Sequence, residues 1–288
     1  MAVFKAAGSG IGTASRRPRL LLILWVINVL FALLIAGPFF ALFSSDLGHS
    51  LLGRNLQTLD FIWLGDLFFR YQNVAPAALA AVAIPVVLYA LVYVFLNGGI
   101  IGRLLDGEGL TTPRTFFSDC GRFFWRFVRL FLVSLLFYAL AFGVILEALS
   151  ALLKPVSEKA LTEWPDFWIS GLHSVAALLC LSLVHMVFDY ARILVVAEDD
   201  RRVLHALMTA LRFVGKRFFR AWFLYLLIAA GSVAGTAVYV LVGQAIPPEG
   251  LAWTGLGILW GQVFIAFRLW TKMVFFSGQA EYVRITPY

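Results

Sequence analysis

Long apolar segments alternate with shorter polar or basic segments along the whole chain. Each apolar segment contains about 20 residues, the length that a helix needs to cross a bilayer. The first one also exceeds the roughly 7 to 15 apolar residues of a signal peptide, which favours an uncleaved span. We therefore expect an all-α, polytopic membrane protein with six transmembrane helices, at residues 20–43, 76–96, 130–149, 167–188, 221–242 and 251–275.

The connector between the fourth and fifth spans has the periodicity of an amphipathic helix. Between residues 203 and 218 the apolar side chains recur at helical spacing, at Leu204, Leu207, Met208, Leu211, Val214 and Phe218. Arg212, Lys216 and Arg220 follow one another at the same spacing on the other side, which is typical of a helix that lies at a membrane surface. Together with Arg217, these basic residues form a predicted interfacial or docking face.

Polar residues mark the starts of the connector helices. Asp199 and Asp200 stand where a side-chain N-cap and a negative first-turn charge favour a helix, so this helix is predicted to begin at about Arg201. A second connector helix is predicted at residues 113–129, where Thr112 supplies the N-cap. Its arginines share one face and its phenylalanines share the other, and it runs directly into the third span.

The pattern divides the chain into one membrane domain and two short ends. Residues 1–19 are expected to be an N-terminal segment, residues 20–276 the six-helix transmembrane domain, and residues 277–288 a C-terminal tail. Within the longest loop, residues 58–70 combine aromatic and charged side chains, which predicts a short interfacial helix. The second span is expected to end at Asn97 and the two glycines that follow it.

Composition agrees with a membrane protein, because 61% of the residues are hydrophobic, 14% are charged and the mean hydropathy is +0.89. The net charge of +7 could indicate a nucleic-acid partner. However, all but four of the 23 basic residues fall in segments that the span count places on one side of the membrane. The positive-inside rule explains this bias with both termini in the cytoplasm, so no nucleic-acid partner is expected.

A few polar residues fall inside the predicted spans, where burial without partners is costly. Asn28, in the first span, is expected to bond to a neighbouring helix. Asp189, Arg192, Arg268 and Lys272 lie near the cytoplasmic ends of spans four and six. They favour an Asp189 to Arg192 ion pair with snorkelling side chains. The alternative is that Arg192, Arg268 and Lys272 form a cationic pocket for a lipid headgroup or another anion.

Two GxxxG motifs predict close helix packing. Gly231 and Gly235 form one in the fifth span, and Gly257 and Gly261 form the other in the sixth span. Small residues at this spacing let two helices approach closely. Packing within the chain is the favoured use, and contact with a protein partner or a second copy is the alternative.

Signals for catalysis or cofactor binding are missing. Cys120 and Cys180 are too few for a disulfide framework or a Cys-rich metal site. His173 and His185 share one predicted helix at a spacing that two haems could use, but each haem would need a second ligand from another span. The HExxH, GxGxxG, P-loop and nucleophile-elbow motifs do not occur. The sequence therefore predicts no metal and no cofactor, and it disfavours an enzyme.

The stretch DYARILVVAEDDRRVLHALMTALRF, at residues 189–213, together with the six-span layout, resembles a group of bacterial inner-membrane proteins of unassigned activity. They are similar to the membrane domain that is fused to some glycerophosphoryl diester phosphodiesterases. The resemblance implies a multi-pass protein of the bacterial inner membrane. It supplies no catalytic motif, and this chain shows no soluble phosphodiesterase domain.

Two functions fit these observations. The first is a non-enzymatic membrane component that organises lipids, or an accessory subunit of a larger membrane complex. The second is a transporter or permease subunit in which the amphipathic connectors are coupling helices. Membrane lipids are expected partners in both cases, together with a protein partner or a homo-oligomer.

Overall fold

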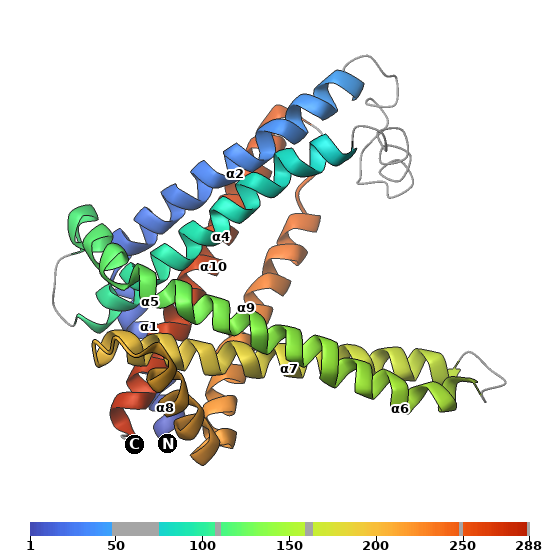
Figure 1. Ribbon diagram of the computed structural model, residues 1–288. Helices are drawn as coiled ribbons and strands as arrows, with labels where there is room; N and C mark the ends of the chain where they lie inside the picture. Colours follow the sequence, from blue (N-terminus) through green and yellow to red (C-terminus); the bar gives the residue numbers. More distant parts are fainter. Residues whose placement is uncertain (48–74, 107–110, 159–163, 248–249, 287–288) are drawn as a thin grey trace. The chain divides into compact units, whose positions relative to one another are not determined.

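The computed structural model describes residues 1–47, 75–106, 111–158, 164–247 and 250–286. Within these ranges the regular structure is helical and no strand occurs. The interfacial helix expected at residues 58–70 lies outside the described residues. The helices are α1 (Ala2–Ser15), α2 (Pro18–Leu47), α4 (Ala75–Leu105), α5 (Pro113–Leu140), a π-helical turn (Ala141–Leu146), α6 (Glu147–Glu158), α7 (Trp164–Ala197), α8 (Val203–Lys216), α9 (Phe218–Gln244) and α10 (Leu251–Ile285) (Figure 1).

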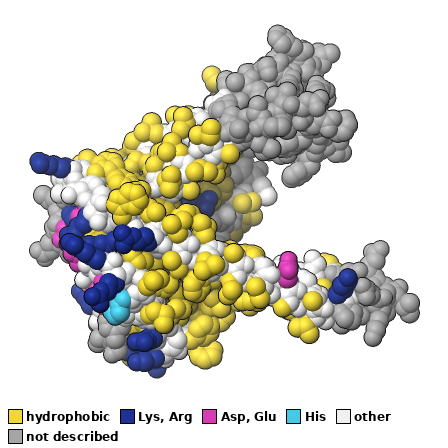
Figure 2. Space-filling model, in the orientation of Figure 1, with side chains coloured by type: hydrophobic (Ala, Val, Ile, Leu, Met, Phe, Trp, Pro, Cys, Tyr) yellow, Lys and Arg dark blue, Asp and Glu magenta, His cyan; other side chains and the backbone are white. Residues whose placement is uncertain are grey.

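Six helical segments in the described part of the chain are long and apolar enough to cross a membrane. Hydrophobic side chains cover most of their surface in the view of Figure 2, as expected for helices whose outer faces contact lipid. The chain is therefore an all-α polytopic membrane protein, as the hydrophobic pattern predicts. The segments are Pro18–Gly37, Ala83–Leu105, Pro113–Lys154, Phe167–Ala197, Phe218–Gln244 and Leu251–Ile285.

The chain forms two compact units. Unit 1 contains α1, the end of α4, α5 to α8, the start of α9 and the end of α10. Unit 2 contains α2 with the remaining parts of α4, α9 and α10. The bounds of unit 1 are Met1–Arg16, Val94–Gly231 and Thr271–Tyr288, and those of unit 2 are Arg17–Tyr93 and Ser232–Trp270.

The core of unit 1 lies where α7, α8 and α10 meet through aromatic side chains. The ring of Phe213 on α8 lies 5.4 Å from the ring of Tyr190 on α7 and 5.8 Å from the ring of Tyr282 on α10. Tyr190 and Tyr282 are completely buried, and Met186 and Leu194 extend the same core along α7. Large apolar side chains of this kind each contribute roughly 1.5 to 3 kcal/mol when fully buried.

Helix α8 forms as the periodicity predicts, but its packing face is rotated. The buried residues are Val203, Ala206, Leu207, Ala210, Phe213 and Val214. Leu204 and Met208, which the sequence analysis placed on the apolar side, are 64% and 51% exposed. Helix α8 contacts α7, and the buried alanines on α8 are small enough to allow a close approach of two helices, while the longer Leu204 and Met208 lie on an exposed edge.

The start of α8 corrects the predicted cap. The helix begins at Val203 and its N-cap residue is Arg202, with no capping side chain. Asp200 instead accepts a hydrogen bond from the backbone N–H of Arg202 at 2.8 Å. Asp199 adopts a left-handed conformation, with φ of 49°, and turns the chain out of α7. Aspartate tolerates this conformation better than most residues, so the two carboxylates shape the turn rather than cap the helix.

Helix α1 has no counterpart in the sequence analysis, which placed no helix in residues 1–19. Its small residues are buried in unit 1. A Cβ atom on Gly10 would lie only 2.7 Å from the Cα atom of Gly278 on α10, and the Ser277 hydroxyl donates a hydrogen bond to the Gly10 carbonyl at 2.8 Å. The two ends of the chain therefore pack together, and α10 continues to Ile285, beyond the predicted end of the sixth span.

Helix α4 also continues beyond its predicted end at Asn97. It runs to Leu105 because its glycines form a groove for α5 rather than a break. A Cβ atom on Gly99 would lie 2.5 Å from the Cys120 sulfur. The Nε atom of Arg103 donates to the carboxylate of Asp119 at 2.6 Å and ties the same two helices together.

In unit 2, hydrogen bonds and aromatic contacts join the helices. Asn28 on α2 donates to the hydroxyl of Tyr89 on α4 at 3.0 Å, which confirms its predicted role in helix contact. The indole of Trp25 donates to the side-chain oxygen of Gln262 on α10 at 3.1 Å. The rings of Tyr239 on α9 and Phe264 on α10 stack at 4.0 Å.

The GxxxG prediction holds at one glycine. An added Cβ on Gly235 would overlap the ring of Phe267 on α10, so this glycine makes a close helix contact. At Gly231, Gly257 and Gly261 an added Cβ would meet nothing within 4 Å. These three glycines therefore make no close contact with another helix among the described residues. Their use in contacts between proteins stays a prediction.

Candidate functional site

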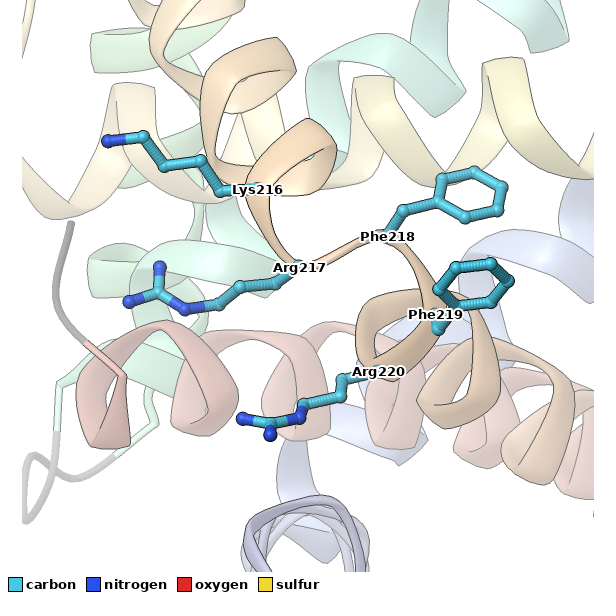
Figure 3. A pocket seen from close by; sticks show the side chains of 5 residues that line it. All are labelled: Lys216, Arg217, Phe218, Phe219 and Arg220. Carbon is cyan, nitrogen blue, oxygen red and sulfur yellow. The ribbon is translucent and has the colours of Figure 1, made fainter.

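Helices α8 and α9 meet at a corner that carries three cationic side chains and two phenyl rings. Lys216, Arg217, Phe218, Phe219 and Arg220 line a pocket of about 400 Å³ there. In Figure 3 the three cationic side chains extend to one side of the chain and the two rings to the other. We call these five residues the basic corner.

A local break in the helix produces this arrangement. Arg217 is the C-cap of α8, with φ of −130° and ψ of 30°, so the chain leaves the helix at a single residue. The backbone N–H of Arg217 bonds to the carbonyl of Val214 at 3.1 Å, and the Arg217 carbonyl accepts from the N–H groups of Arg220 and Ala221. Arg217 therefore ends one helix and begins the next, which spreads its neighbouring side chains apart.

The side chains of the corner have different environments. Lys216 and Arg220 are exposed, whereas Arg217 is half-buried and its guanidinium lies 5.1 Å from the centre of the Phe213 ring. Phe218 stacks on Trp222 at 5.9 Å. Phe219 is 80% exposed, so this large apolar side chain is available to lipid.

A second pocket adjoins the corner through Arg220. Its volume is about 370 Å³, and it is lined by Met1, Ala2, Val3, Phe4, Arg220 and Phe223. The rings of Phe4 and Phe223 lie 6.0 Å apart, edge to face. The N-terminus of α1 and the first turn of α9 thus form one exposed surface on which apolar side chains surround a single arginine.

The predicted interfacial face is only partly gathered at this site. Lys216, Arg217 and Arg220 line the pocket, whereas Arg212 is exposed on α8 and does not line it. The charge spacing identified all four residues, but it assumed one continuous helix. The pocket depends on the break at Arg217, for which the sequence carries no recognised signal.

A buried charged group lies within α7. Asp189 is 1% exposed, and its carboxylate accepts from Nη1 of Arg192 at 2.7 Å and from Nδ1 of His185 at 3.1 Å. The structure thus brings Asp189 and Arg192 together in the ion pair that the sequence analysis considered. It adds His185, which is four residues before Asp189 and therefore on the same helix face.

The three cations of the predicted anion pocket are not all placed together. Lys272, on the part of α10 that belongs to unit 1, lies within electrostatic range of Asp189 and Arg192. Arg268 belongs to unit 2, so its place relative to Arg192 is not determined.

Ion pairs also join α5 to the turn between α7 and α8. Asp199 accepts from Arg122 and from Arg126, both at 2.6 Å. Hydrogen bonds from Arg126 and then Arg122 lower the pKa of the Asp199 carboxyl below its ordinary value. The pKa of Asp200 is lowered by the backbone N–H of Arg202 and by His205.

Among the described residues, no group of three or more His, Cys, Asp or Glu side chains is placed to hold a metal ion. Cys120 and Cys180 are free thiols. No family model, no curated protein and no solved structure matches this chain.

Proposed function

We propose that this chain is a non-enzymatic multi-pass membrane component that binds anionic phospholipid headgroups at the basic corner. The observation that carries the proposal is the pocket of about 400 Å³ lined by Lys216, Arg217 and Arg220 beside the exposed ring of Phe219. Binding of an anionic headgroup at this corner is the means by which the chain organises lipid or a membrane complex.

The chemistry of the corner fits a phosphodiester at a bilayer surface. A guanidinium can donate two parallel hydrogen bonds to phosphate oxygens, and an ammonium adds a mobile point charge. Each basic residue close to an anionic leaflet contributes roughly 1 kcal/mol. Insertion of an exposed ring such as Phe219 beneath the headgroups adds up to about 3 kcal/mol of apolar burial.

The depth of the corner supports the same ligand. Helix α9 ends at Gln244, and Arg220 lies about 36 Å from that end along the axis at a rise of roughly 1.5 Å per residue. The hydrocarbon core is about 30 Å thick. If Gln244 marks one membrane boundary, Arg220 therefore lies in the headgroup layer at the other boundary.

The orientation we propose places α8, both termini and the basic corner on the cytoplasmic side. The positive-inside rule supports this orientation, since all but four of the 23 basic residues lie in the segments on that side or near the cytoplasmic end of the sixth span. In a bacterial inner membrane, this leaflet would supply anionic phospholipids to the corner.

Native mass spectrometry of the purified protein in mixed micelles tests the proposal. The micelles contain phosphatidylglycerol and phosphatidylethanolamine in equal amounts. Lys216→Gln with Arg220→Gln removes two charges from the corner and should weaken phosphatidylglycerol binding by about 2 kcal/mol, or roughly thirtyfold. Arg114→Gln with Arg201→Gln removes two exposed charges elsewhere and is the matched control. Equal lipid binding by the two double variants would contradict the proposal.

A permease subunit is the second candidate, and the exposed edge of α8 favours it. A coupling helix must present apolar side chains to a cytoplasmic motor protein, and Leu204 and Met208 are exposed on α8. Leu204→Gln with Met208→Gln would then release a co-purifying ATPase. Loss of such a partner with unchanged phosphatidylglycerol binding would favour the permease over the lipid-organising component.

A further inference from the structure

The pocket between the start of α1 and the first turn of α9 differs in character from the basic corner. Apolar side chains and one arginine line its volume of about 370 Å³. All of these residues belong to unit 1, which contains α1 and the first part of α9. We call it the α1–α9 pocket, and it is lined by Met1, Ala2, Val3, Phe4, Arg220 and Phe223.

Two phenyl rings form the apolar wall of this pocket. The rings of Phe4 on α1 and Phe223 on α9 lie 6.0 Å apart, with 74° between their planes. Both remain accessible to a ligand, since Phe4 is 62% exposed and Phe223 is 48% exposed. An apolar cavity of about 150 Å³ holds a benzene molecule. The α1–α9 pocket, at about 370 Å³, therefore has room for a hydrocarbon segment several carbons long.

Arg220 belongs to both pockets and determines which charge a shared ligand must carry. It lines the basic corner with Lys216 and Arg217, and it lines the α1–α9 pocket with the two rings. In Figure 3 its side chain extends to the same side as those two cations and away from the rings of Phe218 and Phe219. The two pockets therefore adjoin at one guanidinium. This arrangement suits a ligand with an anionic group at one end and hydrocarbon at the other.

The order of charged and apolar groups along α9 matches a bilayer boundary. The length of α9 places Arg220 in the headgroup layer, as argued above. Phe223 lies three residues further into the span, which is about 4.5 Å deeper at a rise of roughly 1.5 Å per residue. A phospholipid changes from phosphate to hydrocarbon over the same boundary. The positive charge of Arg220 and the depth of Phe223 thus both favour an anionic phospholipid as the occupant.

We propose that the α1–α9 pocket holds the first part of one acyl chain of the phospholipid whose phosphate binds at the basic corner. This inference rests on the proposed function, because the corner supplies the phosphate site. Arg220 contacts the phosphate, and Phe4 and Phe223 contact the carbons that follow the ester group. Helix α1 is then a wall of the lipid site. The site selects a phospholipid with its acyl chains intact over the same headgroup without them.

Photo-crosslinking of the full chain in neutral detergent micelles tests the position of the acyl chain. The probe is phosphatidylglycerol with a diazirine near the ester end of one chain, and mass spectrometry of proteolytic peptides locates the label. The peptides that contain Phe4 and Phe223 should be labelled. Excess phosphatidylglycerol should compete with the probe, whereas glycerophosphoglycerol, which is the deacylated headgroup, should not. A probe with the diazirine at the methyl end of the chain should label these peptides less.

Variants of the two rings test what the pocket contributes to affinity. A chain that moves from the micelle into the pocket stays in apolar surroundings, so each ring contributes mainly dispersion contacts, about threefold in affinity. Phe4→Gln with Phe223→Gln should therefore weaken phosphatidylglycerol binding about tenfold in native mass spectrometry. The preference for phosphatidylglycerol over phosphatidylethanolamine should not change, because both lipids carry the same chains. Ile11→Gln with Leu226→Gln replaces exposed apolar residues elsewhere on α1 and α9 and is the matched control.

The outcomes separate this inference from the proposed function. Absence of label from the α1 peptide, with phosphatidylglycerol still preferred by the wild type, would overturn the acyl-chain site alone. Equal affinities of the ring variant and its control would do the same. Absence of any preference for phosphatidylglycerol in the wild type would contradict both proposals. Phe4→Gln by itself changes one exposed side chain, so it keeps the comparison valid if the double variant does not fold.

Discussion

Two glycines of α1, Gly8 and Gly10, should respond in opposite ways to substitution by alanine, because only Gly10 lies where α1 crosses α10. At Gly10 an alanine Cβ would lie 2.7 Å from the Cα and N atoms of Gly278, and these backbone atoms cannot rotate away. At Gly8 the same atom would meet nothing within 4 Å. Both substitutions gain about 1 kcal/mol of helix propensity, so this gain cancels in the comparison. Only Gly10→Ala adds the overpacking cost of about 1 to 3 kcal/mol.

Trypsin cleavage after Lys5, an exposed residue of α1, measures the release of this helix. Cleavage follows the population of the undocked state when docking is fast. A difference of about 1 to 3 kcal/mol then makes Gly10→Ala roughly 5 to 150 times more sensitive than Gly8→Ala. Gly8→Ala should be at least as resistant as the wild type. Equal cleavage of the two variants would show that α1 does not pack on Gly278.

Three further predictions concern other contacts. The lowered pKa of Asp199 means that its ion pairs stabilise the α5 contact at neutral pH and are lost as the pH falls below the ordinary value of 3.8. Asp199→Asn should therefore remove that part of the fall in melting temperature at acid pH. An unchanged fall in melting temperature would contradict this contribution. Gly235→Leu should destabilise the protein by about 1 to 3 kcal/mol in thermal unfolding, whereas Gly257→Leu should be nearly neutral, and equal effects would contradict the contact with Phe267. Topology reporters should be cytoplasmic after Gly109, Arg201 and Tyr288 and external after Lys159 and Glu249, and an internal signal at either external site would contradict six spans.

The hydrophobic pattern predicts the class of the protein because spans and connectors differ strongly in composition. It also predicts α8, where the basic residues return every three or four positions. It does not predict which apolar face of α8 is buried, because lipid-facing and packing side chains belong to the same residue types. Ala206 and Ala210 belong to the buried face of α8, and they are too small to dominate a hydrophobicity pattern.

Close contacts through glycine are the features that the sequence analysis missed most often. The motif at Gly257 and Gly261 fits the expected spacing but makes no close contact in the described structure. Gly10 and Gly278 do make one, although neither belongs to a GxxxG pair in a predicted span. Such contacts depend on which helices meet, and that depends on the whole fold rather than on local sequence.

The candidate site was predictable in part. Charge spacing points to Lys216 and Arg220, and the rarity of charges within spans points to Asp189 and Arg192. The spacing of four residues between His185 and Asp189 could have identified their contact, since it places both on one helix face. The break at Arg217 could not be anticipated, because no glycine or proline stands at the position where the backbone leaves α8.

Purification of the intact complex from its own membrane, followed by mass spectrometry of bound lipids and proteins, tests the central claim most directly. The comparison is between the wild type, the Lys216→Gln with Arg220→Gln variant and the Arg114→Gln with Arg201→Gln control. A lipid-organising component should carry anionic phospholipid above its membrane abundance, and only the corner variant should lose this enrichment. A stoichiometric ATPase partner, with bound lipids that match the bulk membrane in all three proteins, would contradict the account.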